Sequence, residues 1–132
     1  MPQKILVADD ELDIRNLVKI ILEKNNYQVT VAANGVEALE KAENELPALI
    51  LLDVVMPAKT GWEVCKILKS KDKTKHIPII IFTALSVMVG DKASMKYAQE
   101  AGADGYLPKP FNTDELLAQV KKHLNNKGAA TG

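Results

Sequence analysis

Cysteine and aromatic residues are scarce in this chain of 132 residues: there is one cysteine, and Phe, Trp and Tyr together make up 5%. A single cysteine excludes an internal disulfide and gives no pattern for a thiolate metal site. Cys65 lies in the helix-like run WEVCKIL. We therefore expect it to be a small, half-buried residue of the core or surface rather than a nucleophile.

Net charge is also absent, because 17 Lys and Arg residues balance 17 Asp and Glu residues. This balance gives no general electrostatic reason to expect a nucleic acid or an acidic membrane as a partner. The longest apolar runs, such as IPIIIF, are far too short to span a bilayer. The start MPQK leads directly into an apolar run and leaves no room for a signal peptide. We expect a cytoplasmic protein that binds neither nucleic acid nor membrane directly.

What the sequence does contain is an alternation of short apolar runs with longer segments of helical periodicity. The predicted strands are residues 4–8, 28–32, 48–53, 77–83 and 105–109. Between them, apolar residues recur every three or four positions, as in Ile14, Leu17, Val18, Ile21 and Leu22. The pattern predicts one (βα)5 domain over residues 1–126, followed by a disordered polar tail at 127–132.

Helix-capping signals fall at the boundaries of these segments. Thr60 with Glu63, and Asn112 with Glu115, have the spacing of capping boxes that begin a helix. Gly102 stands where the end of a helix favours a left-handed residue. These signals support the division into strands and helices.

The predicted strands at 48–53 and 77–83 are apolar almost throughout, which is typical of parallel strands covered on both faces. Right-handed crossovers then give an open, doubly wound sheet. Ligands bind such sheets beyond the carboxyl ends of the strands. This rule brings together five polar residues from separate parts of the sequence: Asp9, Asp10, Asp53, Thr83 and Lys109.

The chemistry of this group indicates a phosphoryl site. Each residue taken alone is more often a helix cap or an exposed polar side chain, so the indication comes from the combination. Three carboxylates at one point raise one another's pKa values unless a cation lies among them. Mg²⁺ is favoured, because it takes one or two carboxylates and shares phosphate oxygens. One carboxylate could then attack phosphorus, while Thr83 and Lys109 bind phosphoryl oxygens.

The motifs VADDE, LILLDVVMPAKTGWEVCKILK, PIIIFTAL and AGADGYLPKPF resemble those of the response-regulator receiver domain of two-component signalling, over residues 3–126. The resemblance implies the flavodoxin-like strand order 2-1-3-4-5. It also implies a signalling switch rather than an enzyme. Such a switch takes a phosphoryl group from a phosphohistidine on a sensor histidine kinase or phosphotransfer protein, and then changes its partner binding. Self-phosphorylation and self-dephosphorylation would be incidental.

Carried over residue by residue, the resemblance implies that Asp53 is the phosphoacceptor. Asp10 and Asp53 would bind Mg²⁺ directly, together with the backbone carbonyl of Val55. Asp9 would act mainly through metal-bound water. The resemblance thus assigns a role to each carboxylate in the predicted cluster.

Further residues match the parts of the family that respond to phosphorylation. Thr83 would be the switch hydroxyl, Lys109 an ion-pair partner of the phosphate, and Tyr106 the aromatic residue that turns inward on activation. Pro110 would follow a cis peptide that aims Lys109 into the site. A downstream protein would bind the face formed by helix 4, strand 5 and helix 5. The interval between Thr83 and Lys109 is about one helical turn longer than usual, which puts direct transfer of helix 4 contacts in question.

Two alternative functions share parts of this pattern. A Mg²⁺-dependent phosphohydrolase of the haloacid dehalogenase type also uses an aspartate nucleophile. It needs a second acid two residues later, where this chain has Val55, and it usually needs a substrate pocket. A degenerate receiver that is not phosphorylated has no support, because all five polar residues are present. The sequence leaves open whether the domain acts alone or belongs to a longer protein.

Overall fold

The computed structural model describes residues 3–54, 60–84, 101–109 and 111–131. Its five strands form one parallel sheet in the order β2-β1-β3-β4-β5, as predicted. The strands are β1 (Lys4–Ala8), β2 (Gln28–Ala32), β3 (Leu49–Asp53), β4 (Ile79–Ala84) and β5 (Gly105–Lys109). The predicted bounds of β1, β2 and β5 are confirmed. Strand β4 begins two residues later than predicted, directly after Pro78, which has no N–H to donate.

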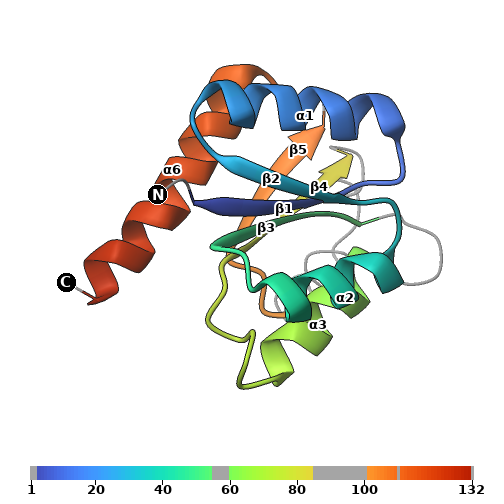
Figure 1. Cartoon of the computed structure of the whole chain (residues 1–132), viewed down its shortest axis with the longest axis vertical. Coiled ribbons are helices and arrows are strands. Elements are labelled where there is room, and N and C mark those ends of the chain that lie inside the picture. The colour runs from blue at the N-terminus through green and yellow to red at the C-terminus, as the bar shows by residue number, and fades with distance from the viewer. Residues whose placement is uncertain (1–2, 55–59, 85–100, 110, 132) are drawn as a thin grey trace.

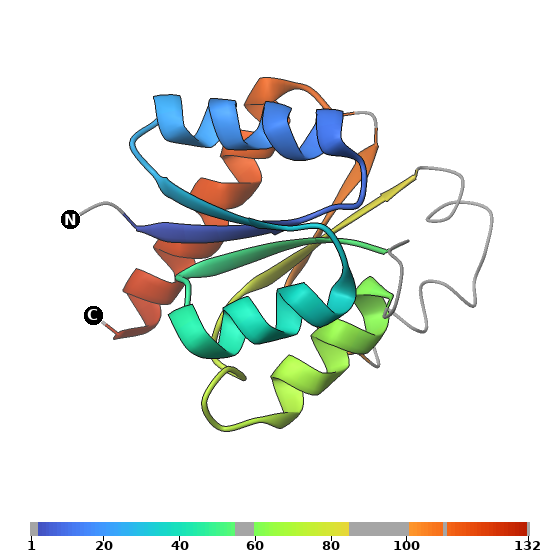
Figure 2. The same ribbon diagram turned by 45° about the vertical axis from the view of Figure 1, so that its right-hand side comes forward.

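Helices cover both faces of the sheet (Figure 1). One face packs against α1 (Leu12–Lys24) and α6 (Thr113–Thr131), and the other against α2 (Gly35–Glu45) and α3 (Gly61–Ser70). Figure 2 shows the sheet between these two helical layers. The doubly wound arrangement predicted from the apolar strands is confirmed.

Alternate residues of the central strands enter two separate hydrophobic cores. Because both faces are covered, the strands read as nearly continuous apolar runs rather than as an alternation with polar residues. The residues facing α2 and α3 are Leu6, Ala8, Ile50, Leu52, Ile79 and Ile81, all fully buried. Those facing α1 and α6 are Ile5, Val7, Leu49, Leu51, Ile80 and Phe82, also fully buried.

The predicted caps are confirmed. Thr60 Oγ1 accepts the Glu63 N–H at 3.2 Å at the start of α3. Asn112 Oδ1 accepts the Glu115 N–H at 2.8 Å, and the Asn112 amide donates back to Glu115 Oε1. Gly102 has a φ of 80°, the left-handed conformation expected at the end of a helix.

Three predictions differ from the structure. Leu17 was placed in the apolar stripe of α1 but is 50% exposed, because it lies at the margin of the face formed by Ile14, Val18, Ile21 and Leu22. Cys65 is completely buried rather than half-buried, since it belongs to the inner face of α3. Helix α6 continues to Thr131, through most of the segment predicted as a disordered tail, because extending an existing helix is far easier than starting one. The domain boundary itself stays a prediction.

Candidate functional site

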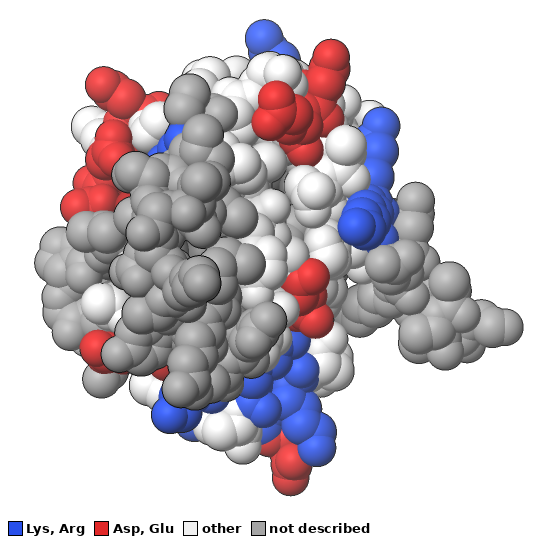
Figure 3. Space-filling model, turned by 180° about the vertical axis from the view of Figure 1, so that it is seen from behind, with Lys and Arg blue, Asp and Glu red and all other residues white. Residues whose placement is uncertain are grey.

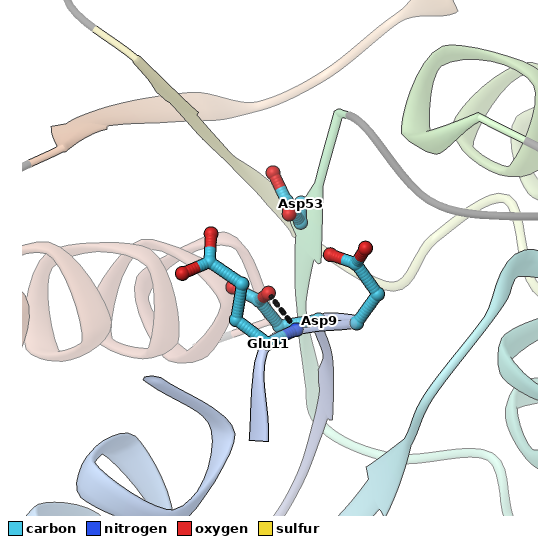
Figure 4. Close-up of side chains that lie close together, drawn as sticks. Asp9, Glu11 and Asp53 are labelled. Atoms are coloured by element: carbon cyan, nitrogen blue, oxygen red, sulfur yellow. Dashed lines mark hydrogen bonds between the residues drawn. The ribbon is translucent and has the colours of Figure 1, made fainter. Parts of the chain in front are cut away.

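Acidic side chains meet at the carboxyl end of the sheet. Asp9 directly follows β1, and Asp53 is the last residue of β3, the strand paired with β1. With Asp10 and Glu11 they form a group whose ligand oxygens all lie within 4.8 Å of one another. Figure 4 shows the side chains of Asp9, Glu11 and Asp53 gathered there. The predicted meeting of Asp9, Asp10 and Asp53 is confirmed.

Asp9 is fully buried, and its N–H, its carbonyl oxygen and both of its carboxylate oxygens form hydrogen bonds. Its N–H donates to the Ala32 carbonyl at 3.1 Å. Its two carboxylate oxygens accept the Glu11 N–H at 2.9 Å and the Lys109 ammonium at 2.8 Å. Its carbonyl oxygen accepts Nη1 of Arg15 at 2.8 Å. Asp9 is therefore a fixed support of the site, which agrees with an indirect role toward a metal ion.

Lys109, at the end of β5, is the cation that faces the acidic group. Its Nζ lies 2.8 Å from Asp9, 3.4 Å from Asp53 and 3.7 Å from Glu11. Burial by itself lowers the pKa of Lys109, but the hydrogen bond with Asp9 and the charges of Asp53, Asp9 and Glu11 raise it above its usual value. The lysine thus stays charged and compensates part of the repulsion among the carboxylates.

A divalent cation fits the charge that remains. Among the described residues, two cationic side chains, Lys109 and Arg15, lie beside four carboxylates, so this part of the site keeps an excess of negative charge. Asp10 and Glu11 are exposed while Asp9 and Asp53 are buried, which places the cluster at the surface with a buried base. An all-oxygen donor set that is open to water on one side suits Mg²⁺ better than a softer metal.

Gly61 lets α3 begin directly against the end of β3. Its N–H donates to the Val54 carbonyl at 2.8 Å. A Cβ at this position would lie 2.2 Å from the carbonyl oxygen of Asp53, a backbone atom that has little freedom to move. The residue therefore allows this close approach, and any side chain there would displace Asp53 or the helix.

Of the other predicted site residues, Thr83 and Tyr106 lie in the described part of the chain. The backbone of Thr83 pairs with Pro108 near the carboxyl end of β4, at the same edge as the acidic group. Tyr106 is partly buried against the core beneath α2 and α3, and burial, followed by the charges of Cys65 and Asp104, raises its pKa. Val55 and Pro110 lie outside the described residues, and so does the segment 85–100 that contains the predicted helix 4.

Arg15 is the site residue that the sequence analysis missed. Its contact is with a backbone carbonyl, and a search for reactive side chains does not reveal such a contact. One signal was available, because Arg15 is the only arginine in the chain. Glu11 occupies the N-cap position of α1, yet its side chain makes no capping hydrogen bond there.

The surface carries both signs of charge. Figure 3 shows acidic and basic side chains in separate small groups over the face opposite to that of Figure 1. Among the described residues, no helix is long and apolar enough to cross a membrane.

Comparison with known proteins gives one consistent answer. Residues 5–121 match the family model of the response regulator receiver domain. The chain is 41% identical to the response regulator MprA of Mycobacterium sp. (strain KMS) over 133 aligned positions, which cover 100% of this chain and 55% of that protein. It spans about half the length of such curated regulators.

Solved structures agree with the family model. The chemotaxis response regulator CheY4 of Vibrio cholerae has a TM-score of 0.85 and 33% identity, covering 93% of this chain and 99% of that one. The receiver domain of sensor histidine kinase PA1611 from Pseudomonas aeruginosa PAO1, which has magnesium in its active-site cleft, has a TM-score of 0.85 and 26% identity over 95% and 99%. With the strand order, the acidic group and the family match in agreement, this chain belongs to the response regulator receiver domain family.

Proposed function

We propose that the chain is a phosphorylation-controlled signalling switch whose phosphoacceptor is Asp53. The main support for the proposal is the position of this carboxylate. Its side chain is 8% exposed, ends β3 within the acidic group, and lies 3.4 Å from the Lys109 ammonium. An anionic nucleophile and an anionic phosphoryl group repel each other unless fixed positive charge lies between them, and Lys109 supplies such charge.

The proposed reaction transfers one phosphoryl group to Asp53. A carboxylate oxygen of Asp53 forms the new bond to phosphorus while the P–N bond of a phosphohistidine breaks, and the electron pair of that bond stays on the imidazole. Lys109 pairs with a phosphoryl oxygen during transfer. The donor is a histidine kinase or a phosphotransfer protein, in keeping with the family. Self-phosphorylation from small donors and self-dephosphorylation are incidental to this role.

Mg²⁺ is the proposed cofactor. Asp10, Asp53 and the backbone carbonyl of Val55 would hold the ion, and Asp9 would act through its bound water. When bound, the ion supplies positive charge to the phosphoryl oxygens and offsets the repulsion of the carboxylates. The all-oxygen donor set at the acidic group supports this assignment.

The proposed readout is a change at the face that includes β5 and α6. Thr83 would bind the phosphoryl group through its hydroxyl, Tyr106 would turn further inward, and Pro110 would help to aim Lys109. A downstream protein would bind this face together with helix 4. In the structure, Tyr106 is partly buried and packs against the core beneath α2 and α3. A cytoplasmic location stays a prediction.

Intact-mass spectrometry after incubation with acetyl phosphate and Mg²⁺ tests the proposal. We expect one added phosphoryl group on the wild type, none on Asp53→Asn, and none when a chelator replaces Mg²⁺. Asp72→Asn is a matched control, because Asp72 is 96% exposed in a turn outside the acidic group. It should be phosphorylated like the wild type.

Two results would contradict the proposal. An unmodified wild type that also fails to bind Mg²⁺ would show that the acidic group is not a phosphoryl site. A phosphoryl group that persists on Asp53→Asn would place the acceptor at another residue.

A further inference from the structure

Arg15 is the only arginine among the 17 Lys and Arg residues of the chain. It lies in α1 one turn after Glu11, whose carbonyl accepts the Arg15 N–H at 3.0 Å. Its guanidinium is partly buried and points back to the end of β1, where Nη1 donates to the carbonyl oxygen of Asp9 at 2.8 Å. A planar, rigid donor group holds a backbone carbonyl more firmly than a flexible ammonium does.

This carbonyl belongs to the peptide that joins Asp9 to Asp10. A peptide unit is planar, so holding its oxygen also fixes the N–H and Cα of Asp10. The next peptide is held as well, because the Glu11 N–H donates to Asp9 Oδ1 at 2.9 Å. Both peptides that flank Asp10 are therefore fixed.

The carboxylate of Asp10 itself is left available. Within the described part of the chain it accepts no hydrogen bond and forms no ion pair, and the residue is exposed. A fixed backbone with an available side chain is the arrangement expected of a metal ligand whose direction is set before the metal binds.

We propose that Arg15 is a positioning residue that fixes the Asp9–Asp10 peptide and thereby aims the Asp10 carboxylate into the metal site. The inference rests on the proposed function, because a Mg²⁺ ligand role for Asp10 gives this fixed geometry its purpose. Arg15 acts through Asp10 and needs no contact with the ion or the phosphoryl group.

The direction of the change in Mg²⁺ affinity when Arg15 is replaced separates a positioning role from simple charge repulsion. A cationic side chain near a cation site weakens metal binding, so removing its charge alone should strengthen Mg²⁺ binding. Loss of the hydrogen bond to the Asp9 carbonyl should weaken Mg²⁺ binding, because the Asp10 carboxylate loses its fixed direction. Supporting groups of this kind typically change metal affinity by about tenfold or more.

Calorimetric titration with Mg²⁺ alone, on the full chain, provides the test. We expect Arg15→Met to bind Mg²⁺ about tenfold more weakly than the wild type. The matched control is Lys19→Met, which removes the same charge one turn further along α1. Lys19 is 42% exposed and forms only a long contact, 3.7 Å, with Glu23. This control should bind Mg²⁺ as tightly as the wild type or slightly more tightly.

The variant Arg15→Lys keeps the charge but loses the planar donor group, so its Mg²⁺ affinity should lie between those of the wild type and Arg15→Met. If Arg15→Met does not fold, as judged by thermal melting without metal, Arg15→Lys decides: weaker binding supports the proposal. Mg²⁺ affinity in folded Arg15 variants equal to or above that of Lys19→Met overturns it. Phosphorylation of the wild type is scored separately, so a failed phosphoacceptor assignment would remain distinguishable from a failed role of Arg15.

Discussion

Two lysine–aspartate pairs lie at opposite ends of the sheet and differ in what surrounds them. At the amino end, Lys69 Nζ lies 2.7 Å from Asp104 Oδ2 and also donates to the Ile77 carbonyl at 2.8 Å. The same carboxylate oxygen of Asp104 accepts the Ile79 N–H at 2.8 Å. One base meets one acid, and backbone groups also form hydrogen bonds with both side chains.

At the carboxyl end, Lys109 pairs with Asp9 at a similar distance, 2.8 Å, but three more carboxylates lie close by. Its charge is shared with Asp53 and Glu11. The pair at the amino end balances one positive with one negative charge, whereas the group at the carboxyl end keeps negative charge that a further cation can neutralise. A lysine–aspartate contact alone therefore does not indicate a functional site, whereas uncompensated charge around such a contact does.

Replacing the lysine of each pair should reveal the largest difference between the two ends of the sheet, in both stability and phosphorylation. Lys109→Met should lower the free energy of unfolding by about 3 kcal/mol without metal, because it leaves the buried Asp9 carboxylate beside other acids. Phosphorylation from acetyl phosphate should slow by about 10²-fold. Lys69→Met should cost only about 1 kcal/mol, since the Asp104 side chain is 38% exposed, and should leave phosphorylation unchanged.

Urea unfolding with and without Mg²⁺ measures this difference. Mg²⁺ should restore part of the stability of Lys109→Met, because it binds the folded carboxylates that lost their partner, and should do nothing specific for Lys69→Met. Equal losses of unfolding free energy in the two variants, with no selective effect of Mg²⁺, would show that the carboxyl end has no greater excess of negative charge than the amino end.

Asp10→Ala should produce a smaller change in stability but a large loss of metal binding. We expect Mg²⁺ affinity to fall by about 10²-fold or more, because a direct ligand is removed. Without metal, the free energy of unfolding should stay the same or rise by about 0.5 kcal/mol, since one of four crowded carboxylates is gone. Thermal melting and calorimetry check both parts. A clear loss of stability without metal would mean that Asp10 mainly supports the backbone.

Much of the fold follows from local patterns in the sequence. The bounds of β1, β2 and β5 were predicted correctly, because short strand-like segments there alternate with longer segments of helical periodicity. The meeting of Asp9, Asp10 and Asp53 was predicted too, since parallel strands bring their carboxyl ends to one edge.

Contacts that depend on three-dimensional packing were harder to predict. The sequence placed Lys109 and Asp9 at the same edge of the sheet and predicted that Lys109 pairs with phosphate, but it did not predict the direct ion pair between these two side chains, which are 100 residues apart. Arg15 was missed because its partner is a carbonyl, which every residue carries. Leu17 was misplaced because helical periodicity does not reveal how far the sheet extends over a helix. The roles of Val55 and Pro110 stay predictions.

His123 also lies at the amino end of the sheet and provides the smallest of the expected effects. His123 lies in α6, is 8% exposed and packs on Gly105, where an added Cβ would lie 2.4 Å from Nε2. Burial lowers the pKa of His123; Asp104 opposes this shift and Lys122 adds to it. The folded protein therefore resists protonation of this imidazole more than the unfolded chain does.

Because the pKa of His123 is lower in the folded state, its contribution to stability is complete above the unfolded value of about 6.5 and declines as the pH falls toward the folded value. Urea unfolding at about pH 7.5 and about pH 5.5 should show this decline in the wild type. His123→Gln cannot titrate and should show a smaller decline. His76→Gln is the matched control, because it makes the same substitution at an exposed histidine. An equal decline in His123→Gln and the wild type would show that His123 does not contribute to the pH dependence.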